Sequence, residues 1–150
     1  MSKILIVEDE ASIRRVLSKI LSEEDENYQI SEAEDGEKAI KMITEDDFDL
    51  VICDIKMPKK DGEEVLAYAK KIKPETTFVM ISGHGDLETA VNTMRLGAFD
   101  YIPKPPDLNR LLTTVRNALD HKTLKVENKL LKKKVSNTYE RLEEDGDAEM

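Results

Sequence analysis

Short apolar runs alternate with helix-patterned stretches five times along this chain. The runs lie at residues 3–7, 28–33, 50–53, 78–81 and 99–102, and the apolar residues between them recur at three- and four-residue spacing. Strands that are joined through helices require right-handed crossovers, which align the strands in parallel. The sequence therefore predicts an α/β fold with a parallel sheet, in which the weakly alternating run at 28–33 is an edge strand.

Local signals indicate where the intervening helices begin and end. Asp35, Asp86 and Asp107 each precede a helical pattern and can act as N-caps. Pro74 breaks the third helix, and Gly97 closes the fourth. We expect the third and fourth helices to pack through the apolar positions Val65, Leu66, Ala69 and Ile72, and Ala90, Val91 and Met94.

Polar residues follow four of the apolar runs. Asp54 ends the most apolar run, and Glu8-Asp9, Ser82 and Lys104 follow three others. In open α/β sheets, ligands bind beyond the carboxyl ends of the strands. One edge of the sheet is therefore expected to gather three acids, a hydroxyl and a lysine.

This set of side chains suits an aspartate that carries a phosphoryl group beside a metal ion. Glu8, Asp9 and Asp54 offer the hard oxygen ligands that Mg2+ prefers, and aspartate is a covalent nucleophile in phosphoryl transfer. Lys104 can pair with the carboxylate and then with phosphoryl oxygens, and Ser82 can hydrogen-bond to them. Solvated loop acids are the alternative, since the chain has 32 Asp and Glu, but the ordered placement at strand ends argues against it.

Composition limits the class of protein. The net charge of -9 argues against nucleic-acid binding by the whole chain. The single cysteine, Cys53, cannot form an intramolecular disulfide. The sequence contains no signal-peptide pattern and no apolar run of membrane-spanning length. We therefore expect a soluble cytoplasmic protein with neither a membrane nor nucleic acid as a direct partner.

The motifs resemble those of the receiver domain of bacterial two-component response regulators, over residues 3–120. They are Glu8-Asp9-Glu10, Cys53-Asp54-Ile-Lys56-Met-Pro58 with Gly62, Ser82-Gly83-His84, and Asp100-Tyr101-Ile-Pro-Lys104-Pro105. The resemblance implies a flavodoxin-like, doubly wound sheet of five strands in the order 2-1-3-4-5, with a C-terminal helical extension here.

The resemblance also implies a mechanism. A sensor histidine kinase would phosphorylate Asp54, and the chain would catalyse this transfer and its slow reversal by water without being a turnover enzyme. Mg2+ would be held by Glu8, Asp9, Asp54 and the backbone carbonyl of Lys56. Glu8 stands where many receivers have Asp, and its longer carboxylate often reaches the metal through water. Ser82 and Tyr101 would form the switch that changes the face around the fourth helix, fifth strand and fifth helix.

The composition changes near residue 121. We interpret residues 1–120 as the receiver domain, 121–142 as a helical linker and 143–150 as an acidic flexible tail. A heptad can be drawn through the linker, with a positions at Asn128, Val135 and Leu142 and d positions at Leu124, Leu131 and Thr138. The hypothesis is a parallel homodimer through this helix and through the face named above, and the alternative is a single amphipathic helix or linker.

Segments 84–91, 97–105 and 127–131 resemble NtrC-type regulators, in which a coiled linker leads to an ATPase that activates an alternative sigma factor. The sequence holds no Gly-x-x-x-x-Gly-Lys-Ser/Thr loop and no evident helix-turn-helix. Either the chain is a fragment of a longer transcription regulator, which we favour, or a receiver that lost its output.

Three other functions fit the sequence less well. A haloacid dehalogenase-type Mg2+ phosphatase would place a second Asp two residues after Asp54, where Lys56 stands. A flavodoxin-like cofactor binder would carry a Ser/Thr/Gly-rich loop in place of Glu8-Asp9-Glu10. A pseudo-receiver that only binds partners would not need the full set of acids, hydroxyl and lysine.

Overall fold

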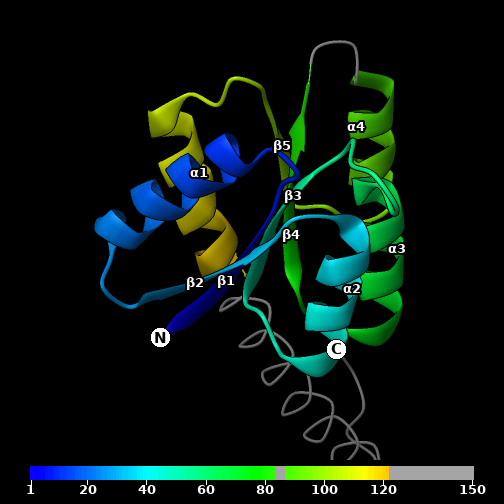
Figure 1. The fold of residues 1–150 in the computed structure, drawn as a ribbon, viewed down its shortest axis with the longest axis horizontal. Coiled ribbons are helices and arrows are strands. Elements are labelled where there is room, and N and C mark those ends of the chain that lie inside the picture. Colours follow the sequence, from blue (N-terminus) through cyan, green and yellow to red (C-terminus); the bar gives the residue numbers. More distant parts are fainter. Residues whose placement is uncertain (84–86, 122–150) are drawn as a thin grey trace, which may run out of the picture.

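The chain forms a parallel sheet in the computed structural model, which describes residues 1–83 and 87–121. Within these residues the sheet has five strands in the order β2-β1-β3-β4-β5, and Figure 1 shows the sheet lying between the helices. This confirms the predicted flavodoxin-like topology. The strands are β1 (Ser2–Val7), β2 (Tyr28–Ala33), β3 (Leu50–Asp54), β4 (Thr77–Ser82) and β5 (Asp100–Pro103).

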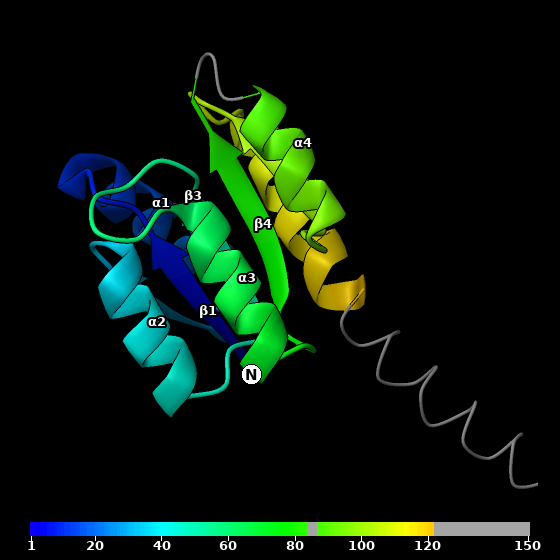
Figure 2. The same cartoon turned by 90° about the vertical axis from the view of Figure 1, so that its right-hand side faces the viewer.

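Helices cover both faces of the sheet. One face carries α2 (Gly36–Glu45), α3 (Gly62–Ile72) and α4 (Leu87–Arg95). The other face carries α1 (Ala11–Glu24) and the helix over residues 108–121. Figure 2 shows α2, α3 and α4 side by side in front of the sheet.

Each face of the sheet has its own apolar core, because successive strand residues point to opposite sides. In β1, Leu5 and Val7 face the α2–α4 side, and Ile4 and Ile6 face the α1 side. Every residue of β3 is buried. Burial on both faces explains why these strands are continuous apolar runs rather than alternating ones.

The predicted helix signals are mostly confirmed. Asp35 Oδ1 accepts the Lys38 N–H at 2.8 Å, and Asp107 Oδ1 accepts the Arg110 N–H at 3.0 Å. Gly97 has a φ of 108°, a left-handed conformation that favours glycine after α4.

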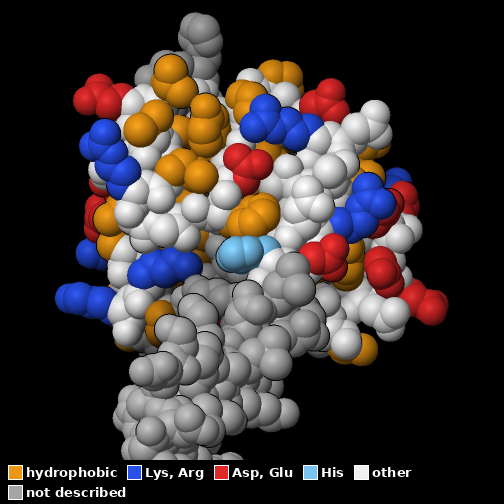
Figure 3. Space-filling view, turned by 180° about the vertical axis from the view of Figure 1, so that it is seen from behind, with side chains coloured by type: hydrophobic (Ala, Val, Ile, Leu, Met, Phe, Trp, Pro, Cys, Tyr) orange, Lys and Arg blue, Asp and Glu red, His pale blue; other side chains and the backbone are white. Residues whose placement is uncertain are grey.

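Part of the expected packing is wrong. Ile72 is 38% exposed at the end of α3 and does not belong to its buried stripe. Val91 and Met94, together with Leu87, lie at four- and three-residue spacing on the outer side of α4 and are also exposed. Figure 3 looks onto the face that carries α4 and β5, and hydrophobic side chains gather there. The apolar spacing marked a helix face correctly but did not show whether that face is covered.

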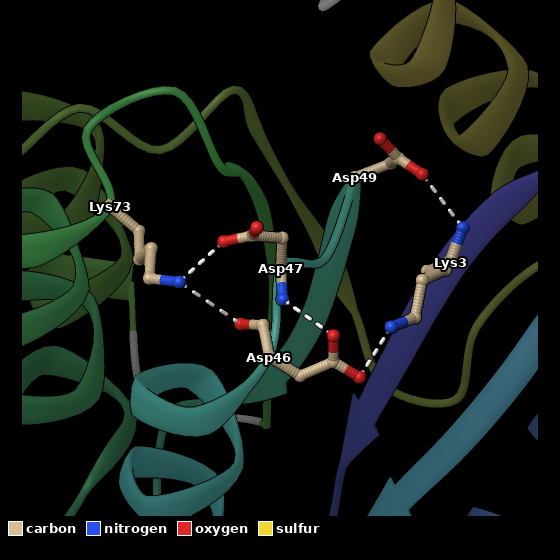
Figure 4. Close-up of polar contacts among 5 residues, drawn as sticks. All are labelled: Lys3, Asp46, Asp47, Asp49 and Lys73. Atoms are coloured by element: carbon tan, nitrogen blue, oxygen red, sulfur yellow. Dashed lines mark hydrogen bonds and ion pairs between the residues drawn. The ribbon is translucent and has the colours of Figure 1, made fainter.

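Ion pairs join the loops at the amino end of the sheet (Figure 4). The Lys3 ammonium pairs with Asp46, and the Lys3 backbone N–H donates to Asp49 Oδ2 at 2.8 Å. Lys73 pairs with Asp47 and reaches the Asp46 carbonyl at 3.4 Å. These contacts tie β1 and the end of α3 to the loop between α2 and β3.

Several predictions lie outside the described residues. They concern Asp86 as an N-cap, the heptad in the linker and the acidic tail at 143–150. In the part of the chain that is described, no helix has the length and apolar character needed to cross a membrane.

Candidate functional site

The sheet brings the predicted polar residues to one edge. Asp54 is the last residue of β3 and Ser82 the last of β4, while Glu8 directly follows β1. Lys104 follows β5, and its backbone N–H donates to the Ser82 carbonyl at 2.8 Å. The parallel register of the strands therefore places these residues together, as the sequence predicted.

Three carboxylates form a cluster at this edge. Glu8, Asp9 and Asp54 each offer an oxygen, and these oxygens all lie within 4.8 Å of one another. Glu8 is 0% and Asp54 3% exposed, whereas Asp9 is open to solvent. Three hard oxygen donors with one open side fit Mg2+, which keeps several waters when it binds proteins.

A single ammonium group lies between two of these acids. Lys104 Nζ is 2.8 Å from Asp54 Oδ2, and 3.1 and 3.3 Å from the two Glu8 oxygens. One positive charge therefore faces two buried carboxylates, with Asp9 nearby. Because three acids surround one lysine, the cluster can accommodate a further cation.

This arrangement shifts two pKa values. Burial raises the pKa of Glu8 to about 8, and the hydrogen bond and negative charge of Asp54 act in the same direction. Burial alone would lower the pKa of Lys104, but its contacts with Asp54 and Glu8 raise it. Without a metal, Glu8 is thus held largely protonated at neutral pH while Lys104 stays charged.

The backbone of Asp54 is held close to the start of α3. The Gly62 N–H donates to the Ile55 carbonyl at 2.7 Å. A Cβ built on Gly62 would lie 2.2 Å from the Asp54 carbonyl oxygen, so no other residue fits without a shift of the backbone. Asp61 caps α3 by accepting the Glu64 N–H at 2.9 Å, a cap that the sequence reading missed because the segment was taken as loop.

The structure also places the predicted switch residues. Ser82 is buried at the end of β4, and Tyr101 is half-buried in β5 against the core on the α2–α4 side. The Tyr101 backbone is fixed on both sides, because its N–H donates to Asp100 Oδ1 at 2.8 Å and its carbonyl accepts from Arg110 Nη2 at 2.9 Å. Lys56 is exposed at the start of the loop after β3, and its carbonyl as a metal ligand stays a prediction.

Arg14 is a residue of the site that sequence reasoning missed. From the first turn of α1 its Nη1 donates to the Glu8 carbonyl at 2.8 Å. The sequence did carry a signal, because Arg14 precedes the buried Leu17 and Leu21 at helical spacing. A charged residue in line with a buried stripe usually has a partner.

Known proteins resemble this chain in sequence and in fold. The family described as the response regulator receiver domain matches residues 4–116. A response regulator of Rickettsia bellii described as NtrX-like is 39% identical over 134 residues, which are 88% of this chain and 28% of the relative. The regulatory protein AtoC of Escherichia coli is 32% identical over 140 residues, 93% of this chain and 30% of the relative. The crystal structure of NtrX from Brucella abortus has a TM-score of 0.80 at 40% identity and covers 87% of this chain and 30% of that one.

These matches agree with the resemblance to NtrC-type regulators that the motifs indicated. The chain spans less than a third of the length of each of these three relatives. The family model covers most of the strands and helices described above, including every residue of the acid cluster. The chain belongs to the response regulator receiver domain family.

Proposed function

We propose that this chain is a phosphorylation-controlled signalling switch in which a sensor histidine kinase transfers a phosphoryl group to Asp54. Receiver domains are phosphoacceptor signalling domains rather than classical enzymes. The observation that carries the proposal is the buried Asp54 carboxylate, which lies 2.8 Å from the Lys104 ammonium and within 4.8 Å of two further acids.

In this proposal Glu8, Asp9 and Asp54 hold Mg2+ together with the Lys56 carbonyl. When bound, the ion supplies positive charge between the carboxylate nucleophile and the phosphoryl donor, which otherwise repel each other. The raised pKa keeps Glu8 protonated in the metal-free site. Glu8 would therefore lose this proton when the ion binds, since a carboxylate ligand must be deprotonated.

The chain's own residues then act at defined atoms. An Asp54 carboxylate oxygen attacks phosphorus, and the bond from phosphorus to the donor's imidazole nitrogen breaks. The Lys104 ammonium exchanges its contact with Asp54 for one with a phosphoryl oxygen, and the Ser82 hydroxyl donates to another. Water later attacks the acyl phosphate, which restores the Asp54 carboxylate and releases inorganic phosphate.

The output face of the switch is proposed to be α4, β5 and the helix over residues 108–121. Phosphorylation shifts an equilibrium between two conformations, with Ser82 moving toward the phosphoryl group and Tyr101 turning inward. The exposed apolar stripe of Leu87, Val91 and Met94 on α4 supports a contact role for this face, because such side chains gain from being covered.

We further propose that the chain is the receiver part of a longer transcription regulator. Residues 1–120 would form the receiver and 121–142 a helical linker that pairs in a homodimer, with 143–150 an acidic tail. The greater length of the NtrX-like relatives supports an additional output region.

Intact-mass spectrometry tests the proposal. The chain and its Asp54→Asn variant are incubated with acetyl phosphate, with and without Mg2+. We expect a Mg2+-dependent gain of one phosphoryl group of about 80 Da in the wild type alone. An equal gain in Asp54→Asn would show that another residue is the acceptor. No gain with either acetyl phosphate or a phosphorylated histidine kinase would contradict the proposal.

A further inference from the structure

Arg14 holds the chain at the point where β1 passes into the acid cluster. Its Nη1 donates to the Glu8 carbonyl at 2.8 Å, and its Nε donates to Glu32 Oε1 on β2 at 3.0 Å. The Arg14 side chain is only 15% exposed. The two contacts fix the guanidinium plane, so the group presents one N–H to a defined backbone atom.

The Glu8 backbone is therefore held on both sides. Its N–H donates to the Ala33 carbonyl at 3.1 Å, which extends the pairing of β1 with β2 by one residue. Its carbonyl, which belongs to the peptide group leading into Asp9, accepts from Arg14. The orientation of this peptide group decides where the Asp9 side chain points relative to Glu8.

A fixed backbone matters here because the acids repel one another. The cluster places oxygens of Glu8, Asp9 and Asp54 within 4.8 Å, and Lys104 contacts Glu8 and Asp54. Asp9 is exposed, so packing does not hold its side chain in place. Its position depends on the peptide group that Arg14 holds.

We infer that Arg14 is a positioning residue for the divalent cation, one that keeps the Glu8-Asp9 peptide where both carboxylates reach the same ion. The inference rests on the proposed function, since it assumes that the acid cluster binds Mg2+. Arg14 acts through the Glu8 carbonyl and does not itself contact the ion.

The sign of the effect separates positioning from charge. Arg14 is a cation close to a cation site, so its removal would strengthen divalent binding if only its charge mattered. If Arg14 positions the acids, its removal weakens binding instead. The loss is larger for Mg2+ than for Ca2+, because Mg2+ demands near-ideal octahedral geometry and Ca2+ accepts irregular ligands.

Isothermal titration calorimetry of the full chain with MgCl2 and with CaCl2 tests this inference. Arg14→Ala and Arg14→Gln are compared with Arg15→Ala, which removes the same charge from an exposed neighbouring position. We expect both Arg14 variants to raise the Kd for Mg2+ by ~10-fold and that for Ca2+ by less than about threefold. Arg15→Ala should change either Kd by less than about twofold, since exposed charges are screened.

A third variant, Arg14→Lys, keeps the positive charge but lacks the planar guanidinium that contacts Glu8 and Glu32 together, and it should recover part of the Mg2+ affinity. Circular dichroism confirms that each variant is folded before titration. If Arg14→Ala and Arg14→Gln bind Mg2+ as tightly as Arg15→Ala, or more tightly, the inference is wrong while the proposed function stands. If the wild-type chain binds no Mg2+, the inference about Arg14 and the Mg2+ site of the proposed function are both wrong.

Discussion

The two ends of the sheet use the same residue types for different purposes. At the amino end, Lys3 and Lys73 pair with Asp46 and Asp47, whose side chains are 52% and 86% exposed. At the carboxyl end, Lys104 pairs with Glu8 and Asp54, whose side chains are 0% and 4% exposed. Both ends join a lysine to acids across neighbouring elements, and they differ in burial.

The difference in burial accompanies opposite shifts in the pKa values of the acids at the two ends. At the amino end the hydrogen bond from Lys3 lowers the pKa of Asp46, with the Asp47 backbone N–H acting in the same direction, so the ion pair is an ordinary stabilising contact in water. At the carboxyl end burial and Asp54 raise the pKa of Glu8 to about 8. An ionisable group whose surroundings oppose its charged form indicates a ligand site, whereas paired surface charges do not.

The largest difference between the ends should appear when the lysine is removed. Lys104→Ala leaves the buried Asp54 carboxylate without its cation, and we expect the free energy of unfolding to fall by ~3 kcal/mol in metal-free buffer. Lys3→Ala is the matched change at the amino end and should cost clearly less, because its partner is in water. Urea unfolding followed by circular dichroism measures both. Equal losses in the free energy of unfolding for the two variants would show that burial does not distinguish the two ends.

A smaller effect should appear in the pH dependence of stability between about pH 5 and pH 8. The pKa of Glu8 rises from 4.5 to about 8 on folding, so in this range the folded chain holds a proton that the unfolded chain has lost. Stability is therefore highest at the acid end and falls as pH rises through the folded pKa. In metal-free protein, we expect the free energy of unfolding to fall by ~2 kcal/mol less over this pH range for Glu8→Gln than for wild type.

The control for Glu8→Gln is Asp46→Asn, which should leave the slope between about pH 5 and pH 8 unchanged. Thermal unfolding at a series of pH values in the presence of EDTA provides the measurement. A wild-type profile that is flat over this range would show that Glu8 is ionised in the metal-free site.

The smallest effect should appear on the acid side. The pKa of Asp46 is lowered on folding, so its contribution to stability is present above the unfolded value of 3.8 and is lost as pH falls through the folded one. Asp46→Asn should slightly reduce stability at neutral pH and have less effect in strong acid. Added salt should weaken the same contact. An Asp46→Asn chain as stable as wild type throughout would show that this ion pair contributes nothing.

The two ends were also unequally predictable from sequence. Asp54, Glu8 and Lys104 each follow an apolar run, and because parallel strands end at one edge, the pattern alone placed them together. Asp46, Asp47 and Asp49 lie in a loop with no period to fix their direction. The double contact of Lys104 depends on distances that no spacing encodes.

The helix surfaces, too, could be predicted only in part from the sequence. Asp35 and Asp107 were predicted as caps because a helical pattern follows each, and Asp61 was missed because it lies in a loop of charged residues. Val91 and Met94 fit a helical repeat but are exposed. Periodicity identifies an apolar face, and only the neighbouring elements decide whether that face is core or contact surface.

The most direct test of the account is a titration of the 15N-labelled chain with MgCl2, followed by NMR. The account predicts saturable shifts at residues 8, 9, 54 and 104, with residues 3, 46, 47 and 73 unchanged. At the carboxyl end three clustered acids share one lysine, whereas at the amino end Asp46 and Asp47 each pair with a lysine of their own in water. Asp54→Asn should abolish the shifts at the carboxyl end. Shifts of equal size and midpoint at both ends, or at the amino end alone, would contradict the claim that burial separates the two clusters.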